Sequence, residues 1–387
     1  MRSSADVYYW RPRSPHEMNT PSAHGPGPIL LEQQRLATAG ARAARVFMLD
    51  GDLRLAIPQL AVDMPDLPAA MNGGDSNVSM LLYRWSAGKF IADGELPVPG
   101  GEDACFFTIG SAEFLATASI RTGAGPYELN CKSTIFRREQ GRWVSHQSIA
   151  TFAAKKWHFF SIGGRHFLAL AQGVIHDGIV ARHPSRSRIY EWDGQRFVDF
   201  QEIDGPWGYN WHAFKHEGQH FLAYADHARP SVLLRWDGIA FILFQEFAPR
   251  GGRAFTLFRA NGQTFLAFAN LQGESLLYRW ENGSFIRHQT LSGPGAREFA
   301  LIETHEDLYL IQVNFILGTP AMPKTDLLSC IYRWQDQMLV KVEEFATFGA
   351  TDAAAFSADG RRYVVISNSL SRDIRFTENS IVYCFNG

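Results

Sequence analysis

The residues with the clearest potential for chemistry are two Trp-His pairs, Trp157-His158 and Trp211-His212. Histidine exchanges protons near neutral pH, and tryptophan supplies an apolar wall that desolvates a small organic ligand. Aromatic walls with a few imidazoles and carboxylates are typical of a small-molecule pocket that runs acid-base chemistry. The candidate acid-base residues are His158, His212, His227 and Asp226, and the candidate substrate contacts are Trp157, Trp211, Tyr209, His176 and Asp177.

The sequence does not favour a metal ion or a cofactor. His212, His216 and His220 have the spacing of a helical metal-binding face, but Gly218 and the surrounding pattern place them along a hairpin, where they spread apart. No His-Glu-x-x-His, Walker, Gly-x-Ser-x-Gly or EF-hand motif occurs. Any chemistry would therefore be cofactor-free acid-base work, or would use a metal assembled from several repeats.

The elements that would position these residues are copies of one repeat. YRWSAGKF at residues 83–90 returns as YRWENGSF at residues 278–285, and related hairpins carry Trp192, Trp236 and Trp334. The chain holds seven such units, spaced by about 44 to 54 residues. Within each unit, four short apolar stretches separated by Gly-, Asn- and Asp-rich turns predict four β-strands. Units of this kind must stack on their neighbours, which predicts an all-β fold, a seven-bladed β-propeller.

The two ends of the chain are expected to complete the ring together. The seventh unit ends at Phe385 with three strands, whereas LLEQQRL (Leu30–Leu36) has the pattern of a fourth strand. Its Gln34 stands where the fourth strands of other units also carry a glutamine. We therefore expect this segment to complete blade seven and to cover an exposed sheet edge. The propeller would span residues 27–387, and residues 1–26 would form an irregular extension.

Composition narrows the class of partner and the compartment. The formal net charge of the 387 residues is −2, which gives no field for nucleic acid or for an anionic membrane surface. The four cysteines form no Cys-x-x-Cys pair, and the chain has neither an apolar N-terminal segment nor a membrane-length apolar run. We therefore expect a soluble, cytoplasmic monomer with free thiols that binds neither nucleic acid nor a membrane.

Long loops are expected on one face of the propeller. Because the first strand of each unit would be innermost, the loops between second and third strands share one face, and tight turns occupy the other. Loops longer than the topology needs are usually functional or disordered, so their clustering favours a binding surface. The long loops are Gln59–Val78, Ser119–Lys132, Gln172–Ser187, Asn314–Leu328 and Asn368–Asn379.

Aligning the first strands by the residue that opens the second strand places the two Trp-His pairs around the channel mouth. We therefore expect an off-axis cavity near blades three and four, with the Gln172–Ser187 loop as its lid. In blade six the alignment uses Leu308 as its anchor. One ring contains Ala44, Ala104, Trp157, Trp211, Phe255, Glu298 and Ala353, and the next contains Arg45, Cys105, His158, His212, Thr256, Phe299 and Ala354.

A structural interpretation of the same residues stays open. Trp and His at matching positions of consecutive repeats can be packing residues whose imidazoles bond to the backbone. His227, His176 and Asp177 lie in loops that a repeat consensus does not dictate. Asn and Asp commonly stabilise turns through their own side chains, which favours that role for the residues that end the second strands. These residues are Gln172, Asp226, Asn270 and Asn368.

The combination of an [FY]LA-x-A strand, an [IL]YRW-x-x-G-x-F hairpin and an F-x-x-x-Q strand, seven times over, resembles the epilepsy-associated (EAR, or EPTP) repeat family. The resemblance covers residues 27–387 and implies a seven-bladed propeller. It also implies a role in binding other proteins, because the animal members of that family use their propellers in this way. Those members are secreted and carry other domains, whereas this chain shows no signal peptide and no second domain.

Two functions therefore remain. The first is a cofactor-free acid-base enzyme of the lyase, isomerase or cyclase type, with a small-molecule substrate at the channel mouth. The alternative is a non-catalytic propeller that presents its long-loop face to a protein partner. The apparent lack of an accompanying domain shifts our expectation toward the enzyme.

Overall fold

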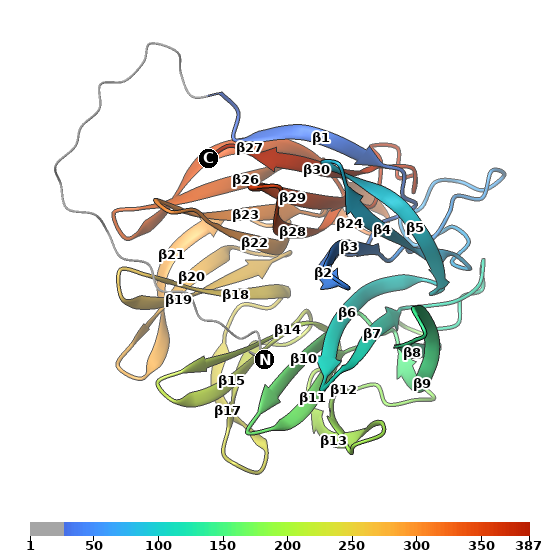
Figure 1. Cartoon of the computed structure of the whole chain (residues 1–387), viewed down its shortest axis with the longest axis horizontal. Coiled ribbons are helices and arrows are strands. Elements are labelled where there is room, and N and C mark those ends of the chain that lie inside the picture. The colour runs from blue at the N-terminus through green and yellow to red at the C-terminus, as the bar shows by residue number, and fades with distance from the viewer. Residues whose placement is uncertain (1–26) are drawn as a thin grey trace.

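The computed structural model describes residues 27–387, and in this range it contains strands and no helix. The strands form seven four-stranded antiparallel sheets that surround a common centre as the blades of a ring (Figure 1). The all-β, seven-bladed fold expected from the repeats is thereby confirmed. The irregular extension expected at residues 1–26 lies outside the described residues.

Within blades one to six the chain runs from the innermost strand to the outermost. Blade one contains β2 (Arg45–Leu49), β3 (Asp52–Ile57), β4 (Ser79–Ser86) and β5 (Lys89–Pro97), and blade two contains β6 (Gly101–Ile109), β7 (Ala112–Ser119), β8 (Asn130–Glu139) and β9 (Arg142–Phe152). Blade three contains β10 (Lys156–Ile162), β11 (Arg165–Ala171), β12 (Ser187–Trp192) and β13 (Phe197–Ile203). Blade four contains β14 (Gly208–His216), β15 (Gln219–Asp226), β16 (Ser231–Trp236) and β17 (Phe241–Phe247).

Blade six carries an extra hairpin, and blade seven is assembled from both ends of the described chain. Blade five contains β18 (Gly252–Ala260), β19 (Gln263–Asn270), β20 (Ser275–Glu281) and β21 (Ser284–Ser292). Blade six contains β22 (Ala296–Glu303), β23 (Leu308–Asn314), β26 (Asp326–Gln335) and β27 (Met338–Phe348), and its extra hairpin consists of β24 (Leu317–Thr319) and β25 (Met322–Lys324). Blade seven contains β28 (Ala350–Ala358), β29 (Arg361–Asn368), β30 (Ser380–Phe385) and β1 (Leu30–Leu36).

The outermost strand of blade seven is β1. It pairs antiparallel with β30, from Leu30 opposite Phe385 to Leu36 opposite Ser380. In Figure 1 the blue β1 runs beside the red strands of blade seven. The pairing covers an edge of β30 that would otherwise present free backbone groups.

A glutamine in the outermost strand joins each of several blades to the next. Nε2 of Gln245 donates a hydrogen bond to the carbonyl of Phe285 at 2.7 Å, and its Oε1 accepts one from the same residue's N–H at 2.9 Å. A carboxylate could not donate the first bond, which explains why glutamine recurs at this position. Equivalent pairs of bonds join Gln34 to Phe90, Gln147 to Phe197, Gln201 to Phe241 and Gln289 to Leu339.

The tryptophans of the repeated hairpins pack between neighbouring blades. The ring of Trp236 lies 5.6 Å from Phe167 of the preceding blade and 5.0 Å from Phe241 of its own blade. Trp280 makes the same contact with Phe221 at 5.7 Å. The apolar core is therefore divided among the spaces between blades. The central channel is left free for polar side chains.

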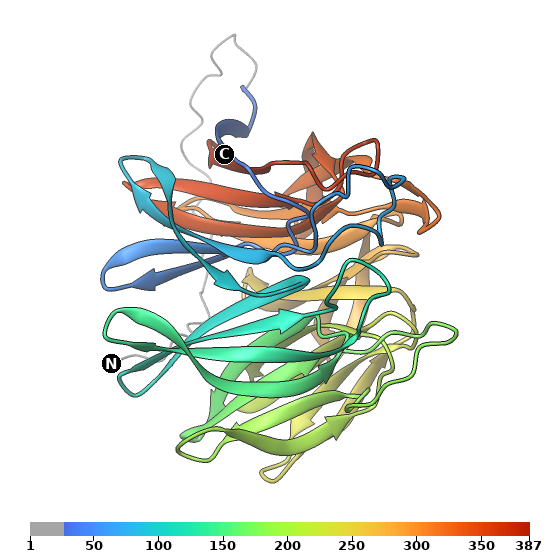
Figure 2. The same cartoon turned by 90° about the vertical axis from the view of Figure 1, so that its right-hand side faces the viewer.

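The two faces of the ring differ in their connections. Figure 2 shows tight hairpin turns gathered on one side of the ring and long loops on the other. Blades four and five have short connections on the long-loop face, because β15 and β16 are separated only by residues 227–230 and β19 and β20 by residues 271–274. We use the name loop belt for the long connections of the other five blades, residues 58–78, 120–129, 172–186, 315–325 and 369–379.

Candidate functional site

A β-bulge near the start of most innermost strands brings two consecutive side chains to the channel. In β14 the pairing with β15 skips from Gly208 to Asn210, so that Tyr209 is an extra residue. Two residues then oppose one on the partner strand, and the regular alternation of side chains is interrupted. Both Tyr209 and Asn210 line a cavity in the channel as a result. The same skip occurs in β6, β18, β22 and β28.

The middle of the channel holds a cavity of about 300 Å³. Every blade contributes to its wall, so the cavity lies on the axis of the ring, and the expected bias toward blades three and four is wrong. Trp157, His158, Trp211 and His212 line this cavity, whereas His227 does not. One representative from each blade is Arg45, Cys105, Lys156, Asn210, Thr256, Glu298 and Asp352.

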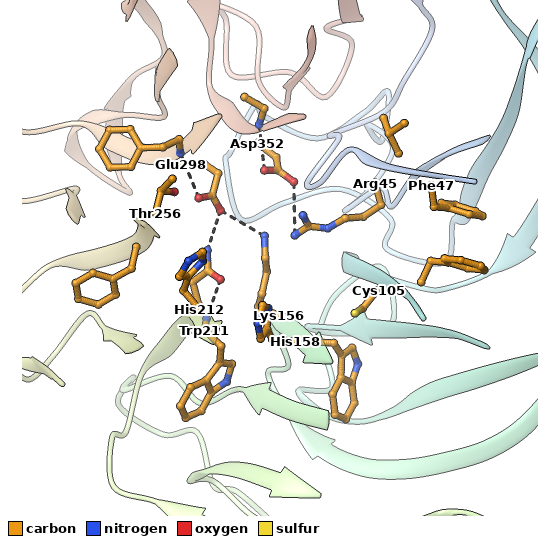
Figure 3. Close-up of a pocket in the computed structure, with 17 residues that line it drawn as sticks. Arg45, Phe47, Cys105, Lys156, His158, Trp211, His212, Thr256, Glu298 and Asp352 are labelled. Atoms are coloured by element: carbon orange, nitrogen blue, oxygen red, sulfur yellow. Dashed lines mark hydrogen bonds and ion pairs between the residues drawn. The ribbon is translucent and has the colours of Figure 1, made fainter. Parts of the chain in front are cut away.

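Charged side chains in this cavity compensate one another. We call Arg45, Asp103, Lys156, Glu298 and Asp352 the inner layer; four of them converge on the cavity in Figure 3. Arg45 Nη2 lies 2.9 Å from Asp103 Oδ1 and 3.8 Å from Asp352 Oδ2. Lys156 Nζ lies 3.3 Å from Glu298 Oε2. Burial raises the pKa of Glu298, which reduces the negative charge of the layer.

The carboxylates of the inner layer also bind backbone groups of the next blade. Asp103 Oδ2 accepts a hydrogen bond from the Trp157 N–H at 2.9 Å, and Asp352 Oδ2 accepts one from the Ala44 N–H at 3.1 Å. Asp103 and Asp352 are each at most 2% exposed. These carboxylates therefore hold neighbouring blades together at the axis.

The two channel histidines are half-buried, and their surroundings favour the uncharged imidazole. Nε2 of His158 accepts a hydrogen bond from the backbone N–H of Ala213 in the next blade at 3.0 Å. Burial lowers the pKa of His158 to about 3 and that of His212 to about 4, and for His158 the nearby His212 and Lys156 add to the effect. A neutral imidazole suits a backbone acceptor and not a general acid at neutral pH. The structural interpretation of His158 is therefore favoured.

The paired tryptophans pack between blades. Trp157 is 2% exposed, and its indole N–H donates to the carbonyl of Thr117 in blade two at 2.9 Å. Trp211 is also 2% exposed, and its ring lies 4.3 Å from that of Tyr224. Little of either indole is left to wall the channel, so these residues serve the core more than a ligand.

Asp226 is used by a turn, as the structural interpretation of the strand ends expects. Its Oδ1 accepts hydrogen bonds from the N–H groups of Ala228 and Arg229, both at 2.8 Å. Its Oδ2 accepts bonds from the Trp207 N–H at 3.1 Å and from the Tyr224 hydroxyl at 3.2 Å. The carboxylate is saturated and 1% exposed, which leaves it no lone pair for a substrate.

The remaining candidates lie nearer the long-loop face and do not form one cluster. His227 packs against Trp207 at 4.6 Å and Tyr209 at 6.0 Å. Burial lowers the pKa of His227 to about 3, and nearby arginines and Lys155 lower it further. His176 and Asp177 are exposed in the loop after β11, where the Nδ1 of His176 lies 2.9 Å from the Asp177 carbonyl oxygen. Neither residue lines the channel cavities.

The sequence alignment of the innermost strands is shifted by one residue in blade six. In blade six, Tyr309 pairs with Ile302, as Phe221 pairs with Phe214 in blade four, so Tyr309 and not Leu308 is the equivalent anchor. Leu308 and Tyr309 are both buried, and the apolar pattern of β23 cannot distinguish them. Phe299 therefore takes the position of Trp211. Glu298 takes that of Asn210, where it accepts a hydrogen bond from the Asn210 amide at 2.8 Å.

The channel has a second set of residues, of which the sequence analysis found only Tyr209. We call this set, which lies toward the long loops, the outer ring; four of its members, Glu102, Lys155, Arg297 and Thr351, directly precede inner-layer residues in the sequence. Lys155 Nζ donates to the carbonyl of Gly173 in a long loop, and the guanidinium groups of Arg42 and Arg297 each lie 5.4 Å from the ring of Phe315 in another. The outer ring consists of Arg42, Glu102, Lys155, Tyr209, Arg253, Arg297 and Thr351.

Residues 27–387 contain neither a preformed metal site nor a membrane-spanning helix. No group of three or more His, Cys, Asp and Glu side chains in this range is arranged to hold a metal ion. His216, one member of the rejected histidine triplet, packs against Trp280 at 4.6 Å, away from His212 in the channel. The same range contains no helix with the length and apolar character needed to span a bilayer.

The blades and the charged axial channel define the chain as a seven-bladed β-propeller. The EPTP domain model matches residues 142–193, 196–237, 240–281 and 338–384. These four segments match the EAR/EPTP repeat family, as the resemblance of the repeats implied.

The chain spans less than a quarter of the length of the two curated relatives that it matches. A thrombospondin-type laminin G domain and EAR repeat-containing protein from Mus musculus is 37% identical over 98 residues, 25% of this chain and 14% of that protein. The Homo sapiens protein of the same name is 30% identical over 149 residues, 38% of this chain and 21% of that protein. The crystal structure of BBS1N in complex with ARL6DN has a TM-score of 0.55 at 11% identity, covering 92% of this chain and 97% of that chain, which supports the fold alone.

The expectation of an acid-base enzyme is wrong. The EPTP matches and the EAR repeat-containing relatives favour a protein-binding propeller, and neither relative has an enzymatic name. The channel agrees with this correction, because His158 and Asp226 are engaged by the backbone. The lyase, isomerase and cyclase assignments are therefore withdrawn. The cytoplasmic location and the monomeric state stay predictions.

Proposed function

We propose that the propeller is a protein-binding module that contacts its partner through the outer surface of the loop belt. EAR/EPTP propellers are protein-interaction domains, and the EPTP matches of this chain support the same class of function. What remains is to identify the surface. The rigidity of the loop belt and its exposed apolar side chains support it as that surface.

Contacts between loops of neighbouring blades make the loop belt continuous from blade six through blades seven, one and two to blade three. Three of the contacts join a residue of one loop to a residue of the next, and the fourth joins Asn130, the first residue of β8, to the loop of blade three. Such contacts fix loops that would otherwise be mobile. The bonds run from Thr325 to the Ser371 carbonyl at 2.7 Å, from the Phe376 N–H to Asp63 at 2.8 Å, from Arg121 to the Asn72 carbonyl at 2.5 Å and from Asn130 to the Val180 carbonyl at 3.1 Å.

An apolar cluster beneath the loop belt adds to this rigidity. It contains Leu60, Met71, Phe315, Leu370 and Phe376, which come from three different loops and are each at most 9% exposed. Burial of large side chains from separate loops stabilises one arrangement of all of them. A preformed surface loses less entropy on binding, so the loop belt is suited to recognition.

The outer surface of the loop belt carries exposed apolar side chains, and this observation decides the proposal. Large apolar residues in water-exposed loops are unfavourable in isolation, whereas an interface that buries them gains binding energy. They are spread over the loops of blades one, three and six. The residues, with their exposed fractions, are Val62 at 42%, Leu67 at 49%, Ile175 at 54%, Val180 at 74% and Met322 at 80%.

Site-specific photo-crosslinking tests the proposal with a matched pair of positions. Met322 lies in the hairpin of the loop belt and is 80% exposed, and Ile239 lies in the tight turn between β16 and β17 and is 79% exposed. A photoreactive amino acid at Met322 should give a discrete adduct with one protein, whose identity mass spectrometry establishes. The same group at Ile239 should not give that adduct.

Binding of the purified partner then checks the surface quantitatively. We expect Met322→Ser combined with Val180→Ser to weaken its affinity at least about tenfold, since two apolar contacts are lost. Ile239→Ser should leave the affinity unchanged. Equal crosslinking from both faces, or an affinity that responds only to Ile239→Ser, would show that the loop belt is not the binding surface.

A further inference from the structure

The outer ring carries more positive charge than its neighbours compensate. Four of its members are cations, and only Glu102 is a carboxylate. Glu102 pairs with Arg42 at 2.7 Å and with Arg297 at 3.5 Å. Within residues 27–387, Lys155 and Arg253 form no ion pair with a carboxylate. Two cationic side chains are therefore left without a counter-charge.

Burial makes this excess charge costly. Lys155 and Arg253 are each 4% exposed. The Nζ of Lys155 donates to the carbonyls of Ala153 and Gly173, which position the ammonium group but do not neutralise it. The Nε of Arg253 is buried, and it has no hydrogen-bond partner in the described part of the chain. A buried cation and an unsatisfied N–H both lower stability unless an anion or acceptor binds them.

The aromatic ring of Tyr209 gathers the cations at one point of the channel. The guanidinium carbon of Arg253 lies 3.6 Å from the ring centroid, that of Arg297 lies 4.9 Å away, and Lys155 Nζ lies 5.3 Å away. The face of an aromatic ring attracts cations but cannot cancel three unit charges. The positive potential is therefore concentrated next to Tyr209.

The space between these side chains is small. Residues of the outer ring, together with Lys156, Asn210 and Glu298, enclose a cavity of about 20 Å³. Such a volume admits one group about the size of a water molecule. It is large enough for a halide ion or for one oxygen of a carboxylate, and it is too small for a whole phosphate or sulfate.

The loop belt is interrupted at blades four and five, and this interruption lies over the part of the outer ring that holds Tyr209 and Arg253. Tyr209 and Arg253 open the innermost strands of blades four and five, whose connections on this face are short. His227 from one of these connections packs against Tyr209 at 6.0 Å, and its side chain lies 3.4 Å from Gln272 of the other. A group that approaches the long-loop face has the thinnest cover to pass at this place.

We propose that the outer ring is a binding site for one small monovalent anionic group, either a free halide-sized ion or a single carboxylate. Arg253 and Lys155 supply the uncompensated charge, Arg42 and Arg297 reinforce it, and Tyr209 holds the cations together. Oxygen and halide anions bind strongly to buried guanidinium and ammonium groups because the hydrogen bonds are charge-assisted. The site is separate from the exposed apolar residues of the loop belt.

Two groups of the outer ring, Lys155 and Tyr209, have lowered pKa values, which gives the site a pH dependence. Burial lowers the pKa of Lys155 to about 8, with Arg253 and Arg297 adding to the effect and Tyr209 and Glu102 opposing it. Although burial opposes it, Arg253, Lys155 and Arg297 lower the pKa of Tyr209 to about 8. Above pH 8 the cluster therefore sheds positive charge by losing protons. Anion affinity should fall as the pH rises through this value.

Calorimetric titration of the full chain in chloride-free buffer tests the site with three probes: sodium bromide, sodium acetate and N-acetylglutamate amide. We expect saturable binding of at least one probe at pH 7, with weaker binding above pH 8. Arg253→Gln should weaken it at least about tenfold. Glu102→Gln should strengthen it, because the ring loses its only carboxylate. Arg287→Gln is the control, since Arg287 is an exposed cation paired with Glu274 at 2.9 Å.

The outcomes separate the two sources of the anion. Binding of bromide and acetate identifies a free small anion, and an anomalous bromide peak beside Arg253 in a crystal would locate it. Binding of N-acetylglutamate amide alone identifies the side-chain carboxylate of a protein. Saturable binding by no probe, or equal affinities in wild type and in Arg253→Gln, overturns the proposal even if Arg253→Gln is less stable. The loop-belt crosslinking would be unaffected by either result.

Discussion

The inner layer and the outer ring of the channel are adjacent in sequence and opposite in character. Glu102 and Asp103 are consecutive, as are Lys155 and Lys156, and in each pair the first residue belongs to the outer ring and the second to the inner layer. In the inner layer, two cations and three carboxylates form a connected network. The outer ring has four cations and one carboxylate, Glu102, which pairs only with Arg42 and Arg297 among the described residues.

This difference shows how one repeat can supply both a structural and a ligand-binding layer. The bulge adds a residue to the innermost strand, and the two consecutive side chains can then vary independently. The residue at the inner position bonds to the backbone of the next blade, as Asp103 does to Trp157. At the outer position, Thr351 also bonds to the next blade, at the carbonyl of Ala41, whereas the Nε of Arg253 has no partner in the described part of the chain.

Removing a carboxylate from the inner layer should have the largest effect. Asp103→Ala leaves Arg45 without its nearest partner and the Trp157 N–H without an acceptor. We expect the free energy of unfolding to fall by about 3–5 kcal/mol in urea denaturation. Glu274→Ala, which breaks an exposed ion pair, should change it by less than about 0.5 kcal/mol. Similar losses in the two variants would show that the inner layer is not structural.

The histidine beside the inner layer should have the next largest effect. His158→Leu removes the acceptor for the buried Ala213 N–H and should lower the free energy of unfolding by about 1–3 kcal/mol. His166→Leu, in the same hairpin but partly exposed and bonded to Ser161, is the control and should cost less than about 0.5 kcal/mol. If His158→Leu melts like the wild type, the backbone bond does not contribute to stability.

Alkaline pH should reveal the outer ring through a smaller change in melting temperature. Lys155 and Tyr209 have pKa values of about 8 in the folded chain, against ordinary values of 10.5 and 10.0. Between about pH 8 and pH 10 the unfolded chain therefore binds more protons than the folded chain, and stability rises with pH. The rise should vanish in the double variant Lys155→Met, Tyr209→Phe. A melting temperature that falls across this interval in the wild type would refute the assignment.

The smallest effect is expected at the surface of the loop belt. Met322→Ser should change the free energy of unfolding by less than about 0.5 kcal/mol, because the side chain is 80% exposed and supports no buried contact. Phe315→Ser, in the same loop but 4% exposed and packed against the guanidinium groups of Arg42 and Arg297, should cost several times more. Equal melting temperatures for the two variants would mean that the loop belt has no apolar core.

The fold could be predicted because the same pattern of strands and turns recurs in successive repeats. A weak copy, such as the unit with Arg138 in place of Trp, is recognised from stronger copies. The recurring glutamine could be located in this way, but its bonds to both backbone groups of a neighbouring blade required the structure. Which residues share a blade is a local property, whereas contacts between blades join residues about 40 positions apart, such as Gln245 and Phe285.

The site was harder to predict because the sequence does not reveal bulges or hydrogen-bond partners. The positions of His158 and His212 around the channel followed from the strand pattern, but their neutrality follows from burial. Asp226 was predicted to be an acid-base residue because the sequence does not show the four N–H and O–H groups that donate hydrogen bonds to its carboxylate. Lys155 and Arg253 look like ordinary surface residues in the sequence, but both line a cavity in the channel, where a bulge in β18 places Arg253.

The pairing of β1 with β30 has a consequence for the order in which the protein is made. During synthesis β1 leaves the ribosome before every other described strand, and its partner β30 leaves after them. The six intermediate blades can form while the chain grows, but β1 must wait with its backbone groups unpaired until nearly the whole chain has emerged. In this order the ring closes when the strand made last captures the strand made first, and a chain that stalls before β30 leaves β1 unpaired.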